Sequence, residues 1–416
     1  MKRNVAVFAI GLAIFAIVVA PLFGGGSREP ARPQVTVFWA LYDGLTEDYR
    51  RDLERSFMEA HPDIDLDIVA IPWDNLYDQI LTSVAAGNPP DVSIIGTRWL
   101  LELKELDAIL PVEDYVSQSL LDNIAEGTKE AEIGGVLWGL PVAAGARLLA
   151  INRDLTDVVP QTMEELVEAA RDVATNTDAY GLIMPGQKHT ELTDFVYYFY
   201  ANGGEFFEVQ ADGSLGRSTV NSQAGIDALQ FMVDVAGESG LVPDGYLSQT
   251  RMDAHPVFYA GNAAYVMIGA WVESSLADAG ATFDVEFAQI PGFAGNPSQP
   301  LVVTDSIAMF KGAGNPEAAA TFIEFFYQDQ WKAQFDELVG FPPVTLSAAA
   351  LPQFDTPLYQ ALGEASINAK GWPLMEGWAE YDDRIWDAVS EALLGIKTPE
   401  QALNDAAASI DRARGF

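Results

Sequence analysis

The sequence contains no cysteine, and only 3 of its 416 residues are histidine. Without cysteine the chain cannot form disulfide bonds, thiolate metal sites, cysteine nucleophiles or a lipid-modified amino-terminal cysteine. His61, His189 and His255 are widely separated, whereas a histidine metal site needs ligands close together on one face of a helix. We therefore predict no bound metal and no cofactor.

Positively charged residues are also scarce. The 23 Lys and Arg residues stand against 60 Asp and Glu residues, which gives a formal net charge of −37. A surface with this charge repels nucleic acids and anionic membranes, so we predict neither as a partner. The same excess of acid keeps a protein soluble in salt-rich surroundings, which favours a saline habitat.

The common catalytic motifs are missing as well. The sequence has no Gly-Lys dipeptide for a phosphate-binding loop, no G-x-G-x-x-G pattern and no G-x-S-x-G pattern. We therefore predict no catalytic residues and no enzymatic activity. One enzyme class stays open, because a secreted glycoside hydrolase needs only two carboxylates at a suitable separation. A metal or anion binder would need clustered hard ligands or basic residues, and the sequence offers few of either.

The amino terminus has the pattern of an export signal. Lys2 and Arg3 precede an uncharged apolar run at residues 5–23, and a Gly-rich and Pro-rich stretch follows it. The run is long enough to span a bilayer, so we predict that residues 1–26 are a signal peptide or a membrane anchor and that residues 27–33 are a linker. Either outcome places the remaining chain outside the cytoplasmic membrane, in the periplasm or at the cell surface.

The length exceeds what one compact core holds, and 49% of the residues are hydrophobic, so we predict two lobes. The first hundred residues alternate between strand and helix patterns. Residues 34–39, 64–68 and 92–95 are apolar or alternating strand segments, and the two segments between them carry apolar residues at helical spacing. This alternation predicts an α/β fold with a parallel sheet.

Further along the chain, capping residues mark the starts of longer helices. Thr162 with Glu165 forms a capping-box pattern, and Asn315 and Thr398 each stand directly before a proline. Apolar residues at helical spacing predict another helix over residues 221–236.

Short segments of characteristic composition follow one another in a specific order between about residue 35 and residue 413. They include Ala86-Gly-Asn-Pro-Pro-Asp-Val92, Trp138-Gly-Leu-Pro141, Phe258-Tyr-Ala-Gly-Asn-Ala-Ala-Tyr-Val-Met-Ile-Gly-Ala-Trp271 and Gly395-Ile-Lys-Thr-Pro-Glu-Gln-Ala-Leu403. Their order and spacing resemble those of the extracellular solute-binding proteins of carbohydrate ABC transporters.

The resemblance implies a two-lobed clamp, each lobe being a mainly parallel sheet flanked by helices. The chain would cross between the lobes several times, near residues 142–146, 302 and 344–349. One lobe would comprise residues 34–143 with 303–346, and the other residues 147–302 with 350–416. As the family does, the protein would capture a sugar or related polyhydroxylated solute between its lobes. It would deliver this solute, as a monomer, to the permease subunits of an ABC-type importer.

The candidate ligand-binding residues follow from the places where such sites form. Open sheets bind ligands beyond the carboxyl ends of their strands, and sugars present flat apolar faces that aromatic rings can cover. In the second lobe the resemblance places a stacking aromatic at Trp271, for which a core position is the alternative, and the loop residue Trp372 also suits the cleft. The predicted ligand-binding residues are Tyr42, Asp43, Thr97, Arg98, Trp99, Trp271 and Trp372.

Overall fold

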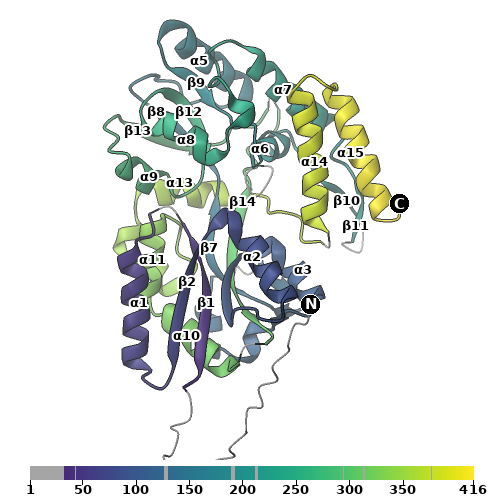
Figure 1. Ribbon diagram of the computed structural model, residues 1–416. Helices are drawn as coiled ribbons and strands as arrows, with labels where there is room; N and C mark the ends of the chain where they lie inside the picture. The colour runs from purple at the N-terminus through teal and green to yellow at the C-terminus, as the bar shows by residue number, and fades with distance from the viewer. Residues whose placement is uncertain are drawn as a thin grey trace, which may run out of the picture. The chain divides into compact units, whose positions relative to one another are not determined.

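The computed structural model describes residues 32–42, 44–125, 130–188, 193–210, 214–293, 295–312, 314–375 and 377–416. The predicted signal or anchor at residues 1–26, most of the predicted linker and Asp43 lie outside these residues. From Pro33 onward the chain forms one compact unit, whose helices and strands are drawn in Figure 1. Within the described part of the chain, no helix has an apolar stretch long enough to cross a membrane.

The first sheet combines amino-terminal strands with one strand from far along the chain. Its order is β2, β1, β3, β14 and β4, and β7 also pairs with β14. β1 is parallel to β2 and β3, whereas β14 is antiparallel to β3, β4 and β7. The strands are β1 (Gln34–Leu41), β2 (Asp65–Pro72), β3 (Val92–Gly96), β4 (Ile109–Leu110), β7 (Leu140–Ala146) and β14 (Val302–Phe310).

The second sheet has the order β13, β8, β12 and β9. β12 is parallel to β9, and β8 is antiparallel to both β12 and β13. Two short hairpins, β5–β6 and β10–β11, lie outside both sheets. The remaining strands are β8 (Leu148–Asn152), β9 (Tyr180–Ile183), β12 (Ala263–Ile268), β13 (Val285–Gln289), β5 (Glu132–Ile133), β6 (Val136–Leu137), β10 (Phe207–Val209) and β11 (Leu215–Ser218).

The expectation of mainly parallel sheets was wrong, because both sheets are mixed. The reason lies in the crossings between the sheets. A strand that arrives from the other sheet enters at the edge where the neighbouring strands have their carboxyl ends. It therefore runs antiparallel to those neighbours. β8 begins two residues after β7 ends, and it runs antiparallel to β12; β14 enters the first sheet in the same way.

Two of the crossings lie side by side. Ala146 at the end of β7 pairs with Val302 at the start of β14, and the N–H of Arg147 donates to the carbonyl of Leu301 at 2.9 Å. The chain therefore passes between the two sheets near residues 146 and 302, close to two of the positions that the resemblance implies.

Helices flank both sheets. In Figure 1, α1 and α10 lie beside β1 and β2, while α7, α14 and α15 lie together near the β10–β11 hairpin. The helices are α1 (Glu47–Ala60), α2 (Trp73–Ala85), α3 (Leu100–Glu105), α4 (Gln118–Asn123), α5 (Met163–Asn176), α6 (Thr193–Ala201), α7 (Gln223–Gly237), α8 (Arg251–Tyr259), α9 (Val272–Asp278), α10 (Pro316–Phe326), α11 (Asp329–Val339), α12 (Leu346–Ala349), α13 (Pro357–Ser366), α14 (Trp378–Leu393) and α15 (Pro399–Ala413).

The first helix shows how the sequence determines these elements. The hydroxyl of Thr46 accepts from the N–H of Tyr49 at 3.2 Å and so caps the start of α1. Tyr49, Leu53 and Phe57 recur at four-residue spacing and are all buried. The helix ends where the N–H of His61 donates to the carbonyl of Phe57, directly before Pro62.

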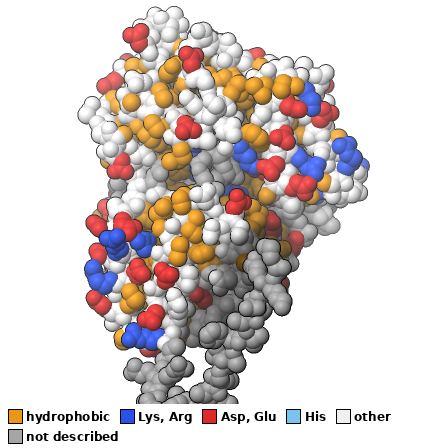
Figure 2. All heavy atoms as spheres, viewed as in Figure 1, with side chains coloured by type: hydrophobic (Ala, Val, Ile, Leu, Met, Phe, Trp, Pro, Cys, Tyr) orange, Lys and Arg blue, Asp and Glu red, His pale blue; other side chains and the backbone are white. Residues whose placement is uncertain are grey.

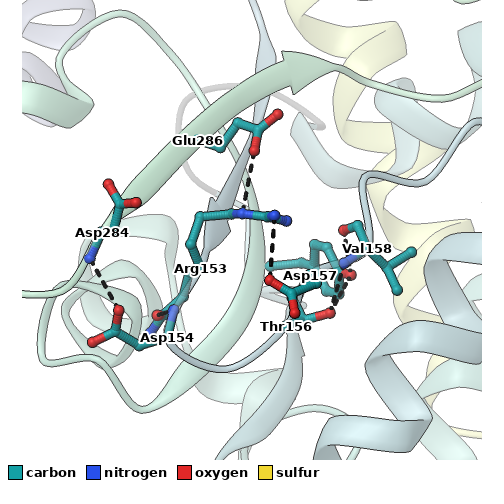
Figure 3. A network of polar contacts seen from close by, with 9 residues as sticks. Arg153, Asp154, Thr156, Asp157, Val158, Asp284 and Glu286 are labelled. Atoms are coloured by element: carbon teal, nitrogen blue, oxygen red, sulfur yellow. Dashed lines mark hydrogen bonds and ion pairs between the residues drawn. The ribbon is translucent and has the colours of Figure 1, made fainter.

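A loop at the outer end of β8 is fixed by a network of charged residues (Figure 3). Nε of Arg153 lies 3.2 Å from a carboxylate oxygen of Glu286 on β13, and its Nη2 lies 3.4 Å from Asp157. The N–H of Asp284 donates to Asp154 at 3.4 Å. These contacts hold the loop after β8 against β13, at the opposite end of β8 from the crossing.

Acidic side chains are spread over the face drawn in Figure 2, with Lys and Arg side chains among them. Many of the basic groups are paired, as Arg171 is with Glu238 at 2.7 Å. Because acids outnumber bases by 37, most carboxylates have no basic group to balance them. Mutual repulsion between surface carboxylates is therefore a permanent destabilising contribution to the folded state.

Candidate functional site

Three strands of the first sheet end at the same edge, and the residues that follow them gather there. Tyr42 follows β1, Trp73 follows β2, and Thr97, Arg98 and Trp99 follow β3. Since β1, β2 and β3 are parallel, their carboxyl ends lie together, which is where open sheets bind ligands.

These residues form a continuous line of aromatic rings. The ring centroids of Tyr42 and Trp73 are 5.6 Å apart, and those of Trp73 and Trp99 are 5.4 Å apart in a stacked arrangement. Tyr77, one turn further along α2, lies 5.0 Å from Trp99. The edge of the first sheet is therefore covered by flat apolar surfaces that hold one another in place.

Tyr42 also connects this edge to the crossing strand. Its hydroxyl donates to Oδ2 of Asp305 on β14 at 2.9 Å. Burial first, and then the neighbouring Asp305, raise the pKa of Tyr42 well above its usual value. The hydroxyl is therefore neutral and serves as a hydrogen-bond donor at all physiological pH values.

Thr97 and Arg98 are buried in the turn after β3. The hydroxyls of Thr97 and Ser306 lie 2.7 Å apart, which joins this turn to β14. The guanidinium of Arg98 lies 5.1 Å from the ring of Trp99, within the range of a cation–π contact. The side chains of Arg98 and Trp99 fold back over Gly96. A Cβ atom at Gly96 would lie only 2.7 Å from Nη1 of Arg98 and 3.1 Å from Cε2 of Trp99. Glycine at this position therefore allows the turn to close.

A pocket of about 360 Å³ lies between this edge and helix α14. The first wall comes from α2, α3 and the turn after β3. The second wall comes from α14, from Met375 shortly before α14, and from Lys188, which lies between β9 and α6. The lining residues are Trp73, Tyr77, Asp78, Arg98, Trp99, Glu102, Lys188, Met375, Trp378, Ala379, Asp382 and Asp383.

Charged and hydroxyl groups stand around the aromatic rings of this pocket. The hydroxyl of Tyr77 donates to Glu102 at 2.5 Å on the first wall. On the second wall, Nζ of Lys188 lies 2.7 Å from Asp382 and 2.5 Å from Asp383. The pocket thus pairs flat apolar surfaces with polar groups, the combination that sugar-binding sites use.

Trp271 lies at the end of β12, near the crossings, and does not line this pocket. Its ring is half-buried and has the guanidiniums of Arg147 and Arg251 at 4.8 Å each. Phe341 lies 6.3 Å from Trp271 and 6.1 Å from Tyr42, so it joins the ring of Trp271 to the aromatic line of the first sheet. The role of Trp271 in ligand binding stays a prediction.

Trp372 lies behind the second wall. It is 9% exposed and packs against Phe206 and Trp378, whose ring centroid is 5.8 Å away. Trp378, rather than Trp372, lines the pocket. The structure thus gathers Tyr42, Thr97, Arg98 and Trp99 at one edge, places Trp271 beside it and Trp372 one layer further back. A ligand contact by Trp372 also stays a prediction, and Asp43 lies outside the described residues.

Several pocket residues were missed by the sequence analysis. Trp73 and Tyr77 follow the carboxyl end of β2, so the rule applied to β1 and β3 would also have found them. Trp378 starts α14 directly after Gly377, a position that no strand marks. Lys188 carried no recognisable signal in the sequence. Within the described residues, no three or more His, Asp or Glu side chains gather in a way that could hold a metal ion.

Comparison with known proteins identifies the family. The profile of a family described as bacterial extracellular solute-binding protein matches residues 42–333. A Brucella abortus protein named as a binding protein is 28% identical over 410 residues, which cover 96% of each chain. The maltotriose-binding protein of Pyrococcus abyssi is 22% identical over 85% of this chain and 75% of its own.

A solved structure gives the same result for the fold. The maltose-bound MalE3 of T. maritima matches with a TM-score of 0.81 at 23% identity, over 91% of this chain and 99% of its own. This similarity confirms the predicted α/β fold of two-lobed binding proteins. Since the family profile covers most of the sequence, the protein belongs to the bacterial extracellular solute-binding protein family.

Proposed function

We propose that this protein captures a sugar or a related polyhydroxylated solute between two lobes and delivers it to an ABC-type importer. In this proposal one lobe comprises residues 34–143 with 303–346, and the other comprises residues 147–302 with 350–416. The crossings between them act as the hinge about which the lobes close on the solute.

The observation that carries the proposal is the pocket with aromatic rings on both walls. Under the proposed division, Trp73, Tyr77 and Trp99 of this pocket would belong to the first lobe, and Trp378 would belong to the second. A pyranose ring has two flat apolar faces and a rim of hydroxyl groups. It could therefore lie between the two sets of rings while its hydroxyls meet the carboxylates and Lys188 at the edge of the pocket.

The names of relatives support a saccharide ligand. The relative from Pyrococcus abyssi is a maltotriose-binding protein, and the similar structure from T. maritima holds maltose. Both are saccharides that present the flat faces and hydroxyl rims that this pocket suits.

The remaining parts of the proposal concern the surroundings of the protein. Residues 1–26 would direct the chain across the cytoplasmic membrane and be cleaved or retained as an anchor. The protein would act as a monomer and would not convert its ligand. Separate subunits of the importer would hydrolyse ATP, because the sequence has no phosphate-binding loop of its own.

The test is a thermal-shift screen over mono- to trisaccharides and polyols, followed by calorimetry with the solute that raises the melting temperature most. Trp99→Ala and Trp378→Ala each remove a ring from one wall, so each should weaken binding by roughly ten- to a hundredfold. Trp386→Ala is the matched control, because Trp386 is half-buried on the same helix as Trp378 and does not line the pocket.

Two outcomes would contradict the proposal. If the two pocket variants and the control bind the solute equally well, the solute does not lie between these walls. If the solute is recovered as hydrolysis products rather than unchanged, the protein is a glycoside hydrolase instead.

A further inference from the structure

The pocket is lined by more acidic than basic side chains. Among the described lining residues, Arg98 and Lys188 are positive, whereas the acidic side chains are Asp78, Glu102, Asp382 and Asp383. The lining therefore has a formal excess of two negative charges. The lining carries the same sign of excess charge as the whole chain, whose formal net charge is −37.

One ammonium group offsets half of the negative charge of the second wall. Nζ of Lys188 lies 2.7 Å from Asp382 and 2.5 Å from Asp383, and these two side chains are adjacent on α14. Burial alone would lower the pKa of Lys188, but the attraction and hydrogen bonds of the two carboxylates together raise it above its usual value. Lys188 is therefore a permanent cation shared by two acids.

The first wall also carries two acidic side chains, Asp78 and Glu102. Glu102 accepts the hydroxyl hydrogen of Tyr77, and Asp78 is the next residue along α2. Burial, then Glu102, Asp78 and Asp383, raise the pKa of Tyr77. The charge of Asp383 on the second wall therefore acts on Tyr77 of the first wall across the pocket.

We propose that Lys188 is the positioning residue that sets which charge of solute the pocket accepts. This inference rests on the proposed function, because it assumes that the solute lies between these walls. With Lys188 in place, the second wall keeps a net charge of −1, the difference between one ammonium and two carboxylates, and can approach Asp78 and Glu102 around an uncharged saccharide. Without it, Asp382 and Asp383 lose the ammonium that they share. The two walls then repel each other more strongly, and an anionic solute meets four carboxylates that Arg98 alone offsets among the described lining residues.

The chain offers a matched control for this group. Lys397 also bridges two acids, Glu391 at 2.8 Å and Asp405 at 2.9 Å, at the far end of α14 and away from the pocket. Lys188→Gln and Lys397→Gln therefore remove the same charge and the same number of ion pairs, but only the first changes the pocket. Lys188→Arg keeps the charge and should restore the behaviour of the wild type.

The experiment measures affinities by calorimetry at about 50 mM and about 500 mM sodium chloride, because salt screens charge repulsion. The probes are maltotriose, a glucosamine trisaccharide and trigalacturonate, which are neutral, cationic and anionic. The wild type should bind trigalacturonate on the order of tenfold or more weakly than maltotriose at low salt. Lys188→Gln should weaken maltotriose binding on the order of tenfold at low salt, and high salt should restore most of the loss. Lys397→Gln should behave as the wild type.

Asp383→Asn is a second variant, which removes one carboxylate of the second wall instead of the ammonium group. The side chain of Asp383 is 68% exposed, so this change leaves the fold intact even if Lys188→Gln lowers the melting temperature. Removing one carboxylate should reduce the discrimination against trigalacturonate by several-fold.

Three results would overturn the inference. Equal or tighter binding of trigalacturonate than of maltotriose would contradict it, and so would a loss in Lys188→Gln that is the same at both salt concentrations. Both results would leave the proposed function standing. If the wild type binds none of the three saccharides, the inference fails, while the proposed function is judged separately by the thermal-shift screen over saccharides and polyols.

Discussion

The position of Trp271 depends on the absence of a side chain at Gly269. A Cβ atom built on Gly269 would lie 1.9 Å from Cζ3 of the indole and 2.5 Å from both Cε3 and Cη2. Ordinary van der Waals contact begins at 3.4 Å, so Gly269→Ala would force the ring to withdraw by about 1.5 Å. The same movement would disturb the contacts of the ring with the guanidiniums of Arg147 and Arg251, which lie at 4.8 Å from it.

We expect Gly269→Ala to lower the free energy of unfolding by about 1–3 kcal/mol, the usual cost of overpacking. If Trp271 stacks against the solute, affinity should also fall by about tenfold or more, since each 1.4 kcal/mol is a factor of ten. In the double variant with Trp271→Ala the clash is absent, so adding Gly269→Ala to Trp271→Ala should cost almost nothing further.

The assay is a thermal melt without solute together with calorimetric affinity for each variant. Gly363→Ala is the matched control, because Gly363 is exposed on α13 and a Cβ there would meet nothing within 4 Å. It should raise the free energy of unfolding by roughly 0.5–1 kcal/mol, through lower backbone entropy of the unfolded chain. A Gly269→Ala protein that melts and binds as the wild type does would refute the placement of the indole. A Trp271→Ala protein that melts lower but binds with unchanged affinity would show that Trp271 is a core residue.

Three further predictions concern stability. Added salt screens the repulsion of a chain with net charge −37, so the melting temperature should rise between low and molar sodium chloride; a flat or falling curve would contradict this. Asp336 forms a buried ion pair with Lys332. Burial raises the pKa of Asp336 from 3.8 to about 7 against the opposing attraction of that ammonium. The stability linked to this carboxyl is therefore complete below pH 3.8 and is lost as pH rises through about 7. Urea unfolding of Asp336→Asn should lack this part of the pH dependence, and an unchanged pH profile would refute it. The hydroxyl of Thr398 accepts from the N–H of Gln401 at 3.2 Å, so Thr398→Ala should lower the free energy of unfolding by about 1 kcal/mol. Ser222 makes no such cap bond, so Ser222→Ala should have a smaller effect in the same urea titration.

The starts of the helices were predictable because capping is a local interaction. Thr46, Thr162, Asn315 and Thr398 all accept a backbone N–H at the first turn of a helix, as their sequence patterns indicate. The helix expected at residues 221–236 is observed at Gln223–Gly237. One detail differs, because the side chain of Glu165 accepts from the N–H of Gln161 rather than from that of Thr162.

The pairing of the strands was not predictable in the same way, since it depends on contacts far apart in the sequence. The antiparallel position of β14 beside β3 joins residues more than two hundred positions apart. The first wall of the pocket follows from a local rule, because Trp73 comes directly after β2 and Trp99 lies in the turn that follows β3. The second wall does not, because Lys188 and Trp378 come from unrelated segments that only the folded chain brings together.

In the proposed function a solute binds between two lobes that close on it. Small-angle scattering of the protein with and without the saccharide that gives the largest thermal shift tests this claim most directly. If the pocket between Trp99 and Trp378 is the binding site, saturating saccharide should draw the lobes together and reduce the radius of gyration. A scattering curve that does not change at saturating saccharide would contradict closure of the two lobes around the solute.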